Sequence, residues 1–97
     1  MASDPGQGRP RRWGRVVDVV AGGVVYTEDA ERLVLAGVRW PSEPERLAAA
    51  EVALTEMVGD RIIFYEVAGA DSLGRLMAEV WVEGMNVNGA LRAMGYG

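Results

Sequence analysis

Arginine and tryptophan side chains are interleaved in two places along the chain. They stand at Arg11, Arg12, Trp13 and Arg15, and again at Arg39 and Trp40. Surfaces that bind single-stranded nucleic acid use this combination, because aromatic rings stack on bases and guanidinium groups hold phosphates. The alternative is a flexible basic tail with both tryptophans buried, either in the core or as a lid over it. The net charge of -4 opposes nonspecific binding, so we expect any attachment to single strands to be weak and salt-sensitive.

The side chains available for catalysis are limited, because the chain contains neither cysteine nor histidine. Disulfide and thiolate chemistry are excluded, and so are the commonest general base and the commonest transition-metal ligand. Carboxylates, hydroxyl groups and arginines remain. The sequence therefore excludes most catalytic schemes, and we expect no cofactor.

The chain of 97 residues, 49% hydrophobic and 25% charged, has the size and composition of one folded domain. Residues 1–12 combine glycine, proline and arginine with few apolar side chains, so we expect a disordered tail there and a folded domain over 13–97. No apolar run approaches the ~20 residues of a membrane-spanning helix, and no secretory signal is evident. These features predict a cytoplasmic domain that makes no membrane contact.

The pattern of apolar residues predicts three strands, a helix, two strands and a short helix. The expected strands are 15–20, 24–27, 32–38, 61–67 and 76–82, and the expected helices are 43–58 and 88–94. Ser42 and Glu45 have the spacing of a capping box, and Gly59 predicts a left-handed helix stop. This order predicts a mainly β domain with helices (α+β). We expect a five-stranded OB-fold-like barrel with a helix between strands 3 and 4 and a short C-terminal helix.

Four segments, in their order and spacing, resemble the staphylococcal nuclease-like (thermonuclease) family. They are 16–18 (Val-Val-Asp), 33–41 (from Leu-Val-Leu-Ala-Gly-Val to Pro), 71–78 (Asp-Ser-Leu-Gly-Arg-Leu-Met-Ala) and 86–96 (from Asn-Val-Asn to Gly-Tyr). The resemblance extends over residues 13–97. It implies the same OB-type barrel.

Catalytic members of this family hold one calcium ion with aspartates and activate a water with a glutamate, and the resemblance places these roles on four positions. Asp18 is retained. Val20 and Arg39 stand where the other aspartates are expected, and Ser42 stands where the glutamate is expected. Calcium needs about six to eight oxygen ligands, which Val20 and the Arg39 cation cannot supply. The resemblance therefore predicts no metal site and no catalytic residue.

Two arginines neutralise the phosphodiester in the family. The first falls on Val34, and the second is retained as Arg75 in a Gly-Arg turn, which makes Arg75 the candidate phosphate-binding residue. The alternative is an ion pair between Arg75 and Asp71. Asp18 and Arg39 are candidates for a polar cleft, with Asp18 either a residual metal contact or an ion-pair partner of Arg39 or Arg75.

These departures predict a noncatalytic nuclease-like OB-type module that binds a ligand or another protein. One alternative is a calcium-dependent nuclease (phosphodiesterase) with a site rebuilt from Asp18, Glu43 and Asp71. Another is a structural interaction domain that uses an exposed sheet edge as its contact surface. The expected partners are single-stranded nucleic acid, bound weakly, or a second protein.

Overall fold

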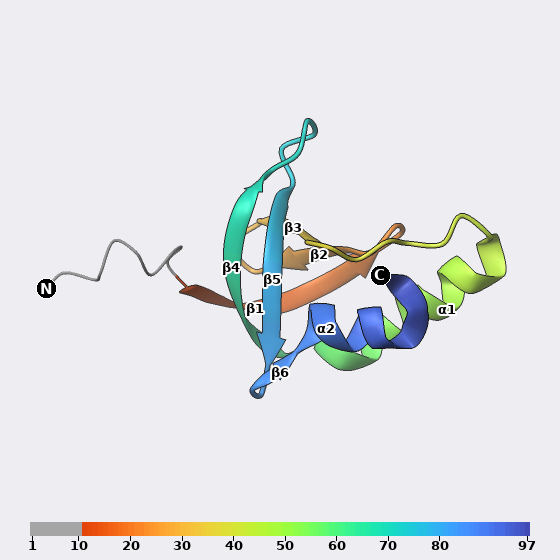
Figure 1. Ribbon diagram of the computed structural model, residues 1–97. Coiled ribbons are helices and arrows are strands. Elements are labelled where there is room, and N and C mark those ends of the chain that lie inside the picture. The colour runs from red at the N-terminus through yellow and green to blue at the C-terminus, as the bar shows by residue number, and fades with distance from the viewer. Residues whose placement is uncertain (1–10) are drawn as a thin grey trace, which may run out of the picture.

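Strand β1 (Arg11–Val20) connects two parts of the sheet. In a computed structural model that describes residues 11–97, its first half pairs antiparallel with β4 (Ile62–Ala70) and its second half pairs antiparallel with β2 (Val24–Thr27). The register shifts between Val16 and Asp18, close to the point where β1 changes partner. An irregularity of this kind bends a strand and increases its twist, so β1 can serve both neighbours (Figure 1).

The other strands continue the sheet until it closes on itself. β3 (Arg32–Leu35) pairs antiparallel with β2 and parallel with β5 (Leu76–Val82), and β5 pairs antiparallel with β4. The pairings therefore run β1, β2, β3, β5, β4 and back to β1, and a short strand, β6 (Met85–Asn86), adds to the end of β5. The described chain is a small, mainly β domain built on one 6-stranded sheet with helices.

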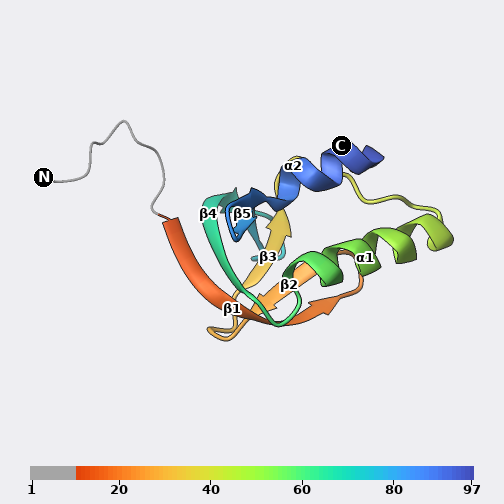
Figure 2. The same cartoon turned by 90° about the horizontal axis from the view of Figure 1, so that it is seen from below.

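Helices cover one end of this ring of strands. α1 (Pro44–Val58) connects β3 to β4, and α2 (Val87–Leu91) follows β6 and continues into a helical turn, η2 (Arg92–Tyr96). Figures 1 and 2 show α1 and α2 lying side by side at the same end of the sheet. Within residues 11–97, no helix is both long enough and apolar enough to cross a membrane.

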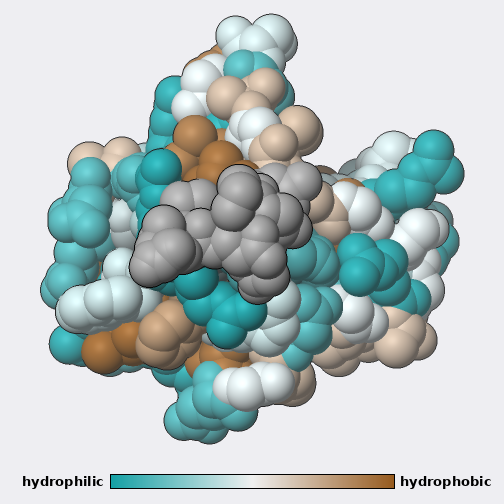
Figure 3. Space-filling model, turned by 60° about the vertical axis from the view of Figure 1, so that its left-hand side comes forward, coloured by the Kyte–Doolittle hydropathy of each residue, from teal (hydrophilic) through white to brown (hydrophobic). Residues whose placement is uncertain are grey.

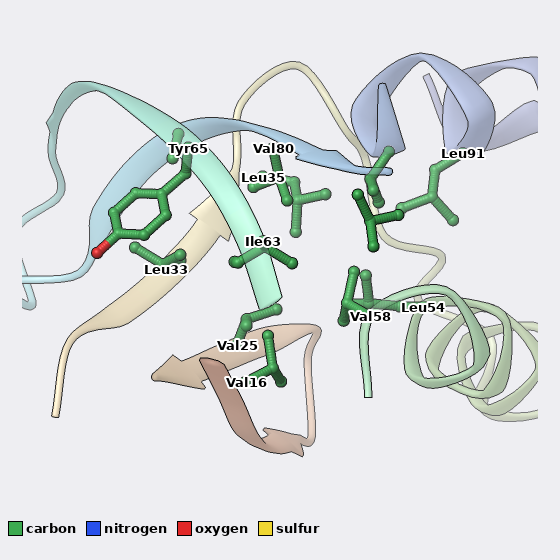
Figure 4. Packing of buried hydrophobic residues seen from close by; sticks show 13 residues of the cluster. Val16, Val25, Leu33, Leu35, Leu54, Val58, Ile63, Tyr65, Val80 and Leu91 are labelled. Carbon is green, nitrogen blue, oxygen red and sulfur yellow. The ribbon is translucent and has the colours of Figure 1, made fainter. Parts of the chain in front are cut away.

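The buried core lies inside the ring and extends to the helices (Figure 4). Alternate residues of β3 and β5 are buried, as Leu33 and Leu35 are in β3. Leu54 and Val58 of α1 and Leu91 of α2 cover the end of the ring with apolar side chains. The buried cluster consists of Val16, Val25, Leu33, Leu35, Leu54, Val58, Ile63, Tyr65, Ala78, Val80, Val82, Val87 and Leu91.

The side chain of Asn88 is fully buried and joins three parts of the fold. Its Oδ1 accepts a hydrogen bond from the Val80 N–H (2.9 Å), and its Nδ2 donates to the carbonyl oxygens of Ala36 (2.8 Å) and Ala78 (3.0 Å). A buried amide is tolerated when its polar atoms are bonded in this way, and it is costly when they are not. Asn88 therefore attaches α2 both to β5 and to the segment that follows β3.

The expected order of strands and helices is confirmed, with β6 as an addition. β1 begins at Arg11, before the expected domain start at Trp13, because Arg11 and Arg12 pair with Glu66 and Tyr65 of β4. The rest of the expected tail, residues 1–10, lies outside the described residues. Pairing with a distant strand thus decides where β1 begins.

Two other strand ends also differ from expectation. β3 ends at Leu35 rather than at residue 38, because Gly37 takes a φ of 73° and the N–H of Val38 bonds back to the carbonyl oxygen of Leu35. β4 continues to Ala70, into the segment expected to be a loop, because Gly69 and Ala70 still pair with β5. A turn shortens one strand and cross-strand pairing lengthens the other.

Helix α1 lies where it is expected, but both of its predicted end signals are wrong. Pro44 takes the first helical position, so the N-cap residue is Glu43, which makes no side-chain capping bond. Ser42 lies one position too early to form the expected capping box. At the other end Gly59 has a φ of -58°, and the left-handed conformation falls on Asp60, with a φ of 61°.

Replacing Leu54 by alanine tests the core. Leu54 is fully buried, so Leu54→Ala should lower the free energy of unfolding by about 2–5 kcal/mol, through lost apolar contact and the cavity left behind. Val52→Ala on the same helix is the matched control. The Val52 side chain is 56% exposed and alanine favours the helix, so this variant should be as stable as the wild type or slightly more stable. Urea unfolding followed by circular dichroism measures both; an unchanged midpoint for Leu54→Ala would remove this residue from the core.

Candidate functional site

Aromatic side chains pack against the turn that follows Val20, one of the positions where the resemblance expects a metal ligand. Trp40 packs against the backbone of Gly23 so closely that a Cβ atom added there would overlap the indole ring. Gly23 lies in the turn that follows Val20, and its N–H donates to the carbonyl oxygen of Val20 (3.1 Å). Trp40 also stacks on Tyr96, with ring centroids 6.5 Å apart. Half-buried Trp40 therefore packs against this turn and does not join the arginines of β1 in one surface.

The two cleft candidates, Asp18 and Arg39, are both exposed and are engaged separately. The carboxylate of Asp18 accepts a hydrogen bond from the N–H of Val19 (2.9 Å). The N–H of Arg39 donates to the carbonyl oxygen of Tyr96 (2.6 Å), which attaches the segment before α1 to the end of η2. Within residues 11–97, no ion pair links Asp18 to Arg39 or to Arg75, so the structure does not bring the cleft candidates together.

The carboxylates of the rebuilt-site alternative, Asp18, Glu43 and Asp71, do not gather either. Glu43 is exposed at the start of α1, next to exposed Ser42, whereas Asp71 lies in the loop of the β4–β5 hairpin. Across the part of the chain that the structure describes, no three aspartate, glutamate, histidine or cysteine residues form a group that could hold a metal ion.

Arg75, the candidate phosphate-binding residue, is engaged by Asp71. Its Nε lies 2.6 Å from Oδ2 of Asp71, and Oδ1 of Asp71 accepts hydrogen bonds from the N–H groups of Leu73 and Arg75, both at 2.9 Å. Burial alone would raise the pKa of Asp71, but the bonds from Arg75 and Leu73 outweigh it and lower the pKa below its ordinary value. The ion pair expected as the alternative is therefore present, and it organises the hairpin loop.

Arg32 lies against the same loop, although no motif singles it out. Its Nη2 donates a hydrogen bond to the carbonyl oxygen of Leu73 (2.8 Å). Because β3 and β5 run parallel, the start of β3 lies beside the loop that leads into β5 through Arg75. The sequence could have identified Arg32 through the two-residue period of a strand. Arg32 lies on the same face of β3 as Val34, the position at which the resemblance expects an arginine.

A row of aromatic side chains crosses the outer face of β1, β4 and β5. Trp13 is opposite Phe64, and Phe64 is opposite Trp81, in the register of the sheet. Trp13 is 64% exposed and Phe64 is 45% exposed, while Trp81 is half-buried. Residues directly opposite on neighbouring strands have Cβ atoms about 4.5–5.5 Å apart, so these rings are neighbours on one surface. We call Trp13, Phe64 and Trp81 the aromatic row.

The surroundings of the aromatic row are mixed in polarity. Ile62, 52% exposed, lies on the same face of β4 and is opposite Arg15. One surface pocket of about 340 Å³ is lined by the second half of β1, Asp18 included, and by the end of α1, and another of about 420 Å³ is lined by Arg11, Phe64, Trp81 and Gly84. Figure 3 views the molecule from the side of β1 and β4 and shows apolar and polar side chains interspersed there.

The arginines expected to hold nucleic acid divide between the two faces of β1. Arg11 and Arg15 lie on the outer face with Trp13, because alternate residues of a strand share a face, and Arg12 lies on the other. Each is paired with a carboxylate: Arg11 with Glu66 (3.1 Å), Arg12 with Glu31 (3.0 Å) and Arg15 with Asp60 (2.6 Å). The hydrogen bond with Asp60 also raises the pKa of Arg15. The positive charge of this segment is therefore largely balanced within the chain.

Arg12 belongs to a polar network with Glu31 and Tyr65. Figure 4 shows Tyr65 at the end of the core opposite the helices. The hydroxyl of buried Tyr65 donates a hydrogen bond to one carboxylate oxygen of Glu31, and the other oxygen accepts from Arg12 (3.0 Å). Burial, followed by the bond and the charge of Glu31, raises the pKa of Tyr65 to about 12. This network closes the polar end of the core.

Comparison with known proteins adds no relative on which a function could rest. No protein-family model matches the chain, and no curated protein gives a significant match. The likeness to the staphylococcal nuclease-like family therefore remains a resemblance in four segments.

The titration of Tyr65 should reduce stability at alkaline pH. The ordinary pKa of tyrosine is 10.0 and that of folded Tyr65 is about 12, so the folded state holds the phenolic proton more tightly than the unfolded state does. The resulting stabilisation is complete below about pH 10 and is lost as the pH rises toward 12. Urea unfolding at several pH values in this range should show a smaller fall in Tyr65→Phe than in the wild type. Tyr26→Phe, which leaves Tyr65 in place, should keep the full fall; equal falls in all three proteins would contradict this assignment.

Proposed function

We propose that this protein is a noncatalytic binding module with an OB-like barrel of the staphylococcal nuclease-like type. The aromatic row carries the proposal. Large exposed aromatic side chains gathered on one sheet face are unfavourable in water and are typical of a surface that contacts a partner. The closed order of strand pairings and the helix between β3 and β4 support the OB-like description, because both agree with the order expected of that fold.

The contacts of Trp40 support a noncatalytic role. Trp40 packs against Gly23, in the turn that follows Val20, where the resemblance expects an oxygen ligand for calcium, and Arg39 has a cation where the resemblance expects an anion. Arg75 is already bonded to Asp71. An inherited phosphodiesterase mechanism uses metal, base and arginine in one transition state, so it would require changes at all of these positions together.

A protein partner suits the aromatic row better than single-stranded nucleic acid does. Arg11, Arg12 and Arg15 each have a carboxylate partner, so phosphates would have to compete with groups already in place. The net charge of -4 adds long-range repulsion. An aromatic centre bordered by paired charges corresponds to the apolar core and polar rim of protein interfaces.

Calcium titration together with a digestion assay tests the noncatalytic part of the proposal. The purified full chain should show no saturable chemical-shift change around Asp18 at physiological calcium, and no metal-dependent cleavage of single-stranded DNA. Arg39→Asp should behave in the same way, because Val20 and Ser42 would still lack the required groups. Saturable shifts accompanied by cleavage would instead establish a calcium-dependent nuclease.

Selection of a displayed random-peptide library on the full chain tests the binding surface. The wild type should enrich a defined set of peptides, and the double variant Trp13→Ala with Phe64→Ala should lose them, since removal of interface aromatics typically costs at least about tenfold in affinity. Both side chains are exposed, so the variant should fold, which a urea unfolding curve verifies. Leu73→Ala is the control, because Leu73 is 63% exposed but lies in the β4–β5 loop. Enrichment of the same peptides by the double variant would place the binding surface elsewhere.

A further inference from the structure

The side chain of Arg11 occupies a site that suits a guanidinium group. Its central guanidinium carbon lies 4.5 Å from the centroid of a Trp81 ring, and its Nε and Nη2 donate to Oε2 of Glu66 at 3.3 and 3.1 Å. A planar cation that stacks on an aromatic face and bonds a carboxylate at its edge is held by both cation–π attraction and charge-assisted hydrogen bonds. The guanidinium of Arg11 is therefore an internal example of the group that this face can bind.

We propose that the outer face of β1, β4 and β5 binds an arginine-bearing segment of a partner protein, and that Arg11 occupies the guanidinium site until the partner's arginine replaces it. This inference rests on the binding function proposed above and names the chemistry of its ligand. The incoming guanidinium stacks on Trp81 and bonds Glu66. The exposed rings of Phe64 and Trp13 then contact the apolar stem of the arginine and its neighbours in the partner segment.

The carboxylates beside the aromatic row provide the complementary charge. Glu66 and Glu79 are directly opposite each other on β4 and β5, a position at which like charges repel. Arg11 approaches Glu66 at 3.1 Å, and Arg92 approaches Glu79 at 3.9 Å. The side chains of Glu66 and Glu79 are still 26% and 33% exposed. Each carboxylate thus already has a cationic partner, and a partner's arginine that takes the place of Arg11 would keep Glu66 paired and screened from Glu79.

The space around Arg11 allows the exchange. The pocket of about 420 Å³ is lined by Arg11 itself together with Phe64, Trp81 and Gly84. Gly84 contributes no side chain, so the approach to the Trp81 ring stays open on that side. The Arg11 side chain is 54% exposed and belongs to the first residue of β1, which lets it turn toward solvent without disturbing the core. Its departure costs one cation–π contact and one surface ion pair, and the partner's arginine restores both.

Nucleic acid fits this part of the face less well. A phosphate placed against the aromatic row would lie close to Glu66 and Glu79, and it would gain Arg11 only by displacing a carboxylate. The whole chain, at a net charge of -4, repels a polyanion and attracts a basic segment. Charge complementarity thus selects the arginine-bearing protein segment as the occupant.

Titration of the full chain with short capped peptides, followed by NMR, tests the proposal. The probes are Gly-Arg-Gly-Arg-Gly and the same peptide with citrulline or lysine in place of arginine. Citrulline keeps the planar shape of arginine but removes its charge, and lysine keeps the charge but lacks the planar group. The arginine peptide should shift the indole N–H signals of Trp81 and Trp13. The lysine peptide should bind about two- to fivefold more weakly, and the citrulline peptide at least about tenfold more weakly.

Variants of the site itself separate recognition from a merely structural role. Arg11→Ala removes the internal competitor, so it should bind the arginine peptide about four- to twenty-five-fold more tightly, since a cation–π contact and a surface ion pair each correspond to roughly two- to fivefold and the two factors multiply. In the Arg11→Ala background, where no internal arginine competes for the site, Glu66→Gln should weaken binding by about two- to fivefold, because only the ion pair is lost. Trp81→Phe, in the same Arg11→Ala background, keeps an aromatic ring and the fold while reducing the cation–π contact, so it should also weaken binding. Glu45→Gln, an exposed carboxylate in the first turn of α1, is the control and should change nothing.

The outcomes distinguish this inference from the proposed function. Equal binding of the citrulline peptide, or weaker binding by Arg11→Ala, would overturn guanidinium recognition. If the display selection enriches peptides without arginine at the aromatic row, the binding function stands and the inference fails. If neither peptides nor the selection engage this face, both fail. A thymidine oligonucleotide that shifts the same tryptophan signals at low salt, while the arginine peptide does not, would overturn the inference in favour of nucleic acid.

Discussion

The parallel pairing of β3 with β5 is the contact on which the rest of this structure depends. β3 spans only Arg32–Leu35, yet it returns the sheet to β5 and closes the ring. The pairing continues past the end of the strand, where the N–H of Ala36 donates to the carbonyl oxygen of Ala78 (2.9 Å) and Asn88 donates to the carbonyl oxygens of both. Parallel pairing of distant strands has to overcome the entropy of the long connection between them. The buried amide of Asn88 offsets part of that cost and, by the same bonds, holds α2 over the end of the core.

The β4–β5 hairpin in turn aligns the aromatic row. Asp71 bonds Leu73 and Arg75 and so fixes the loop from which both strands extend. A bulge between Val67 and Gly69 then shifts the register by one residue before Phe64 comes opposite Trp81. A slip of one residue would move every side chain of a strand to the other face. The Arg75–Asp71 pair therefore has a structural role that does not depend on any phosphate.

The sequence predicts the elements of this fold better than it predicts the site. Runs of β-branched residues locate the strands, and the helical period locates α1, because both signals are local. The helix cap at Glu43 and the left-handed residue Asp60 are missed, since each depends on one dihedral angle that a neighbouring residue could also have adopted.

The aromatic row is missed for a different reason. Phe64 is a neighbour of Trp13 only through the register of β1 with β4, and nothing in the local pattern specifies which residues of distant strands come opposite. The same holds for the carboxylates that neutralise the arginines of β1.

The ion pairs of β1 change how its basic segment, residues 11–15, is interpreted. Read along the chain, Arg11, Arg12 and Arg15 form a concentration of positive charge. In the fold, each is paired with a carboxylate within 3.1 Å, so its charge is balanced, and Trp13 and Phe64 of the aromatic row are exposed on the face that Arg11 and Arg15 share. Arg11 covers part of that row by stacking on Trp81, which reduces the apolar surface open to indiscriminate contact. If a partner's arginine replaces Arg11, the face exchanges one guanidinium for another, keeps its charges balanced and leaves no carboxylate unpaired. Recognition by exchange would thus make the surface selective for a ligand that can repeat both contacts that Arg11 gives up.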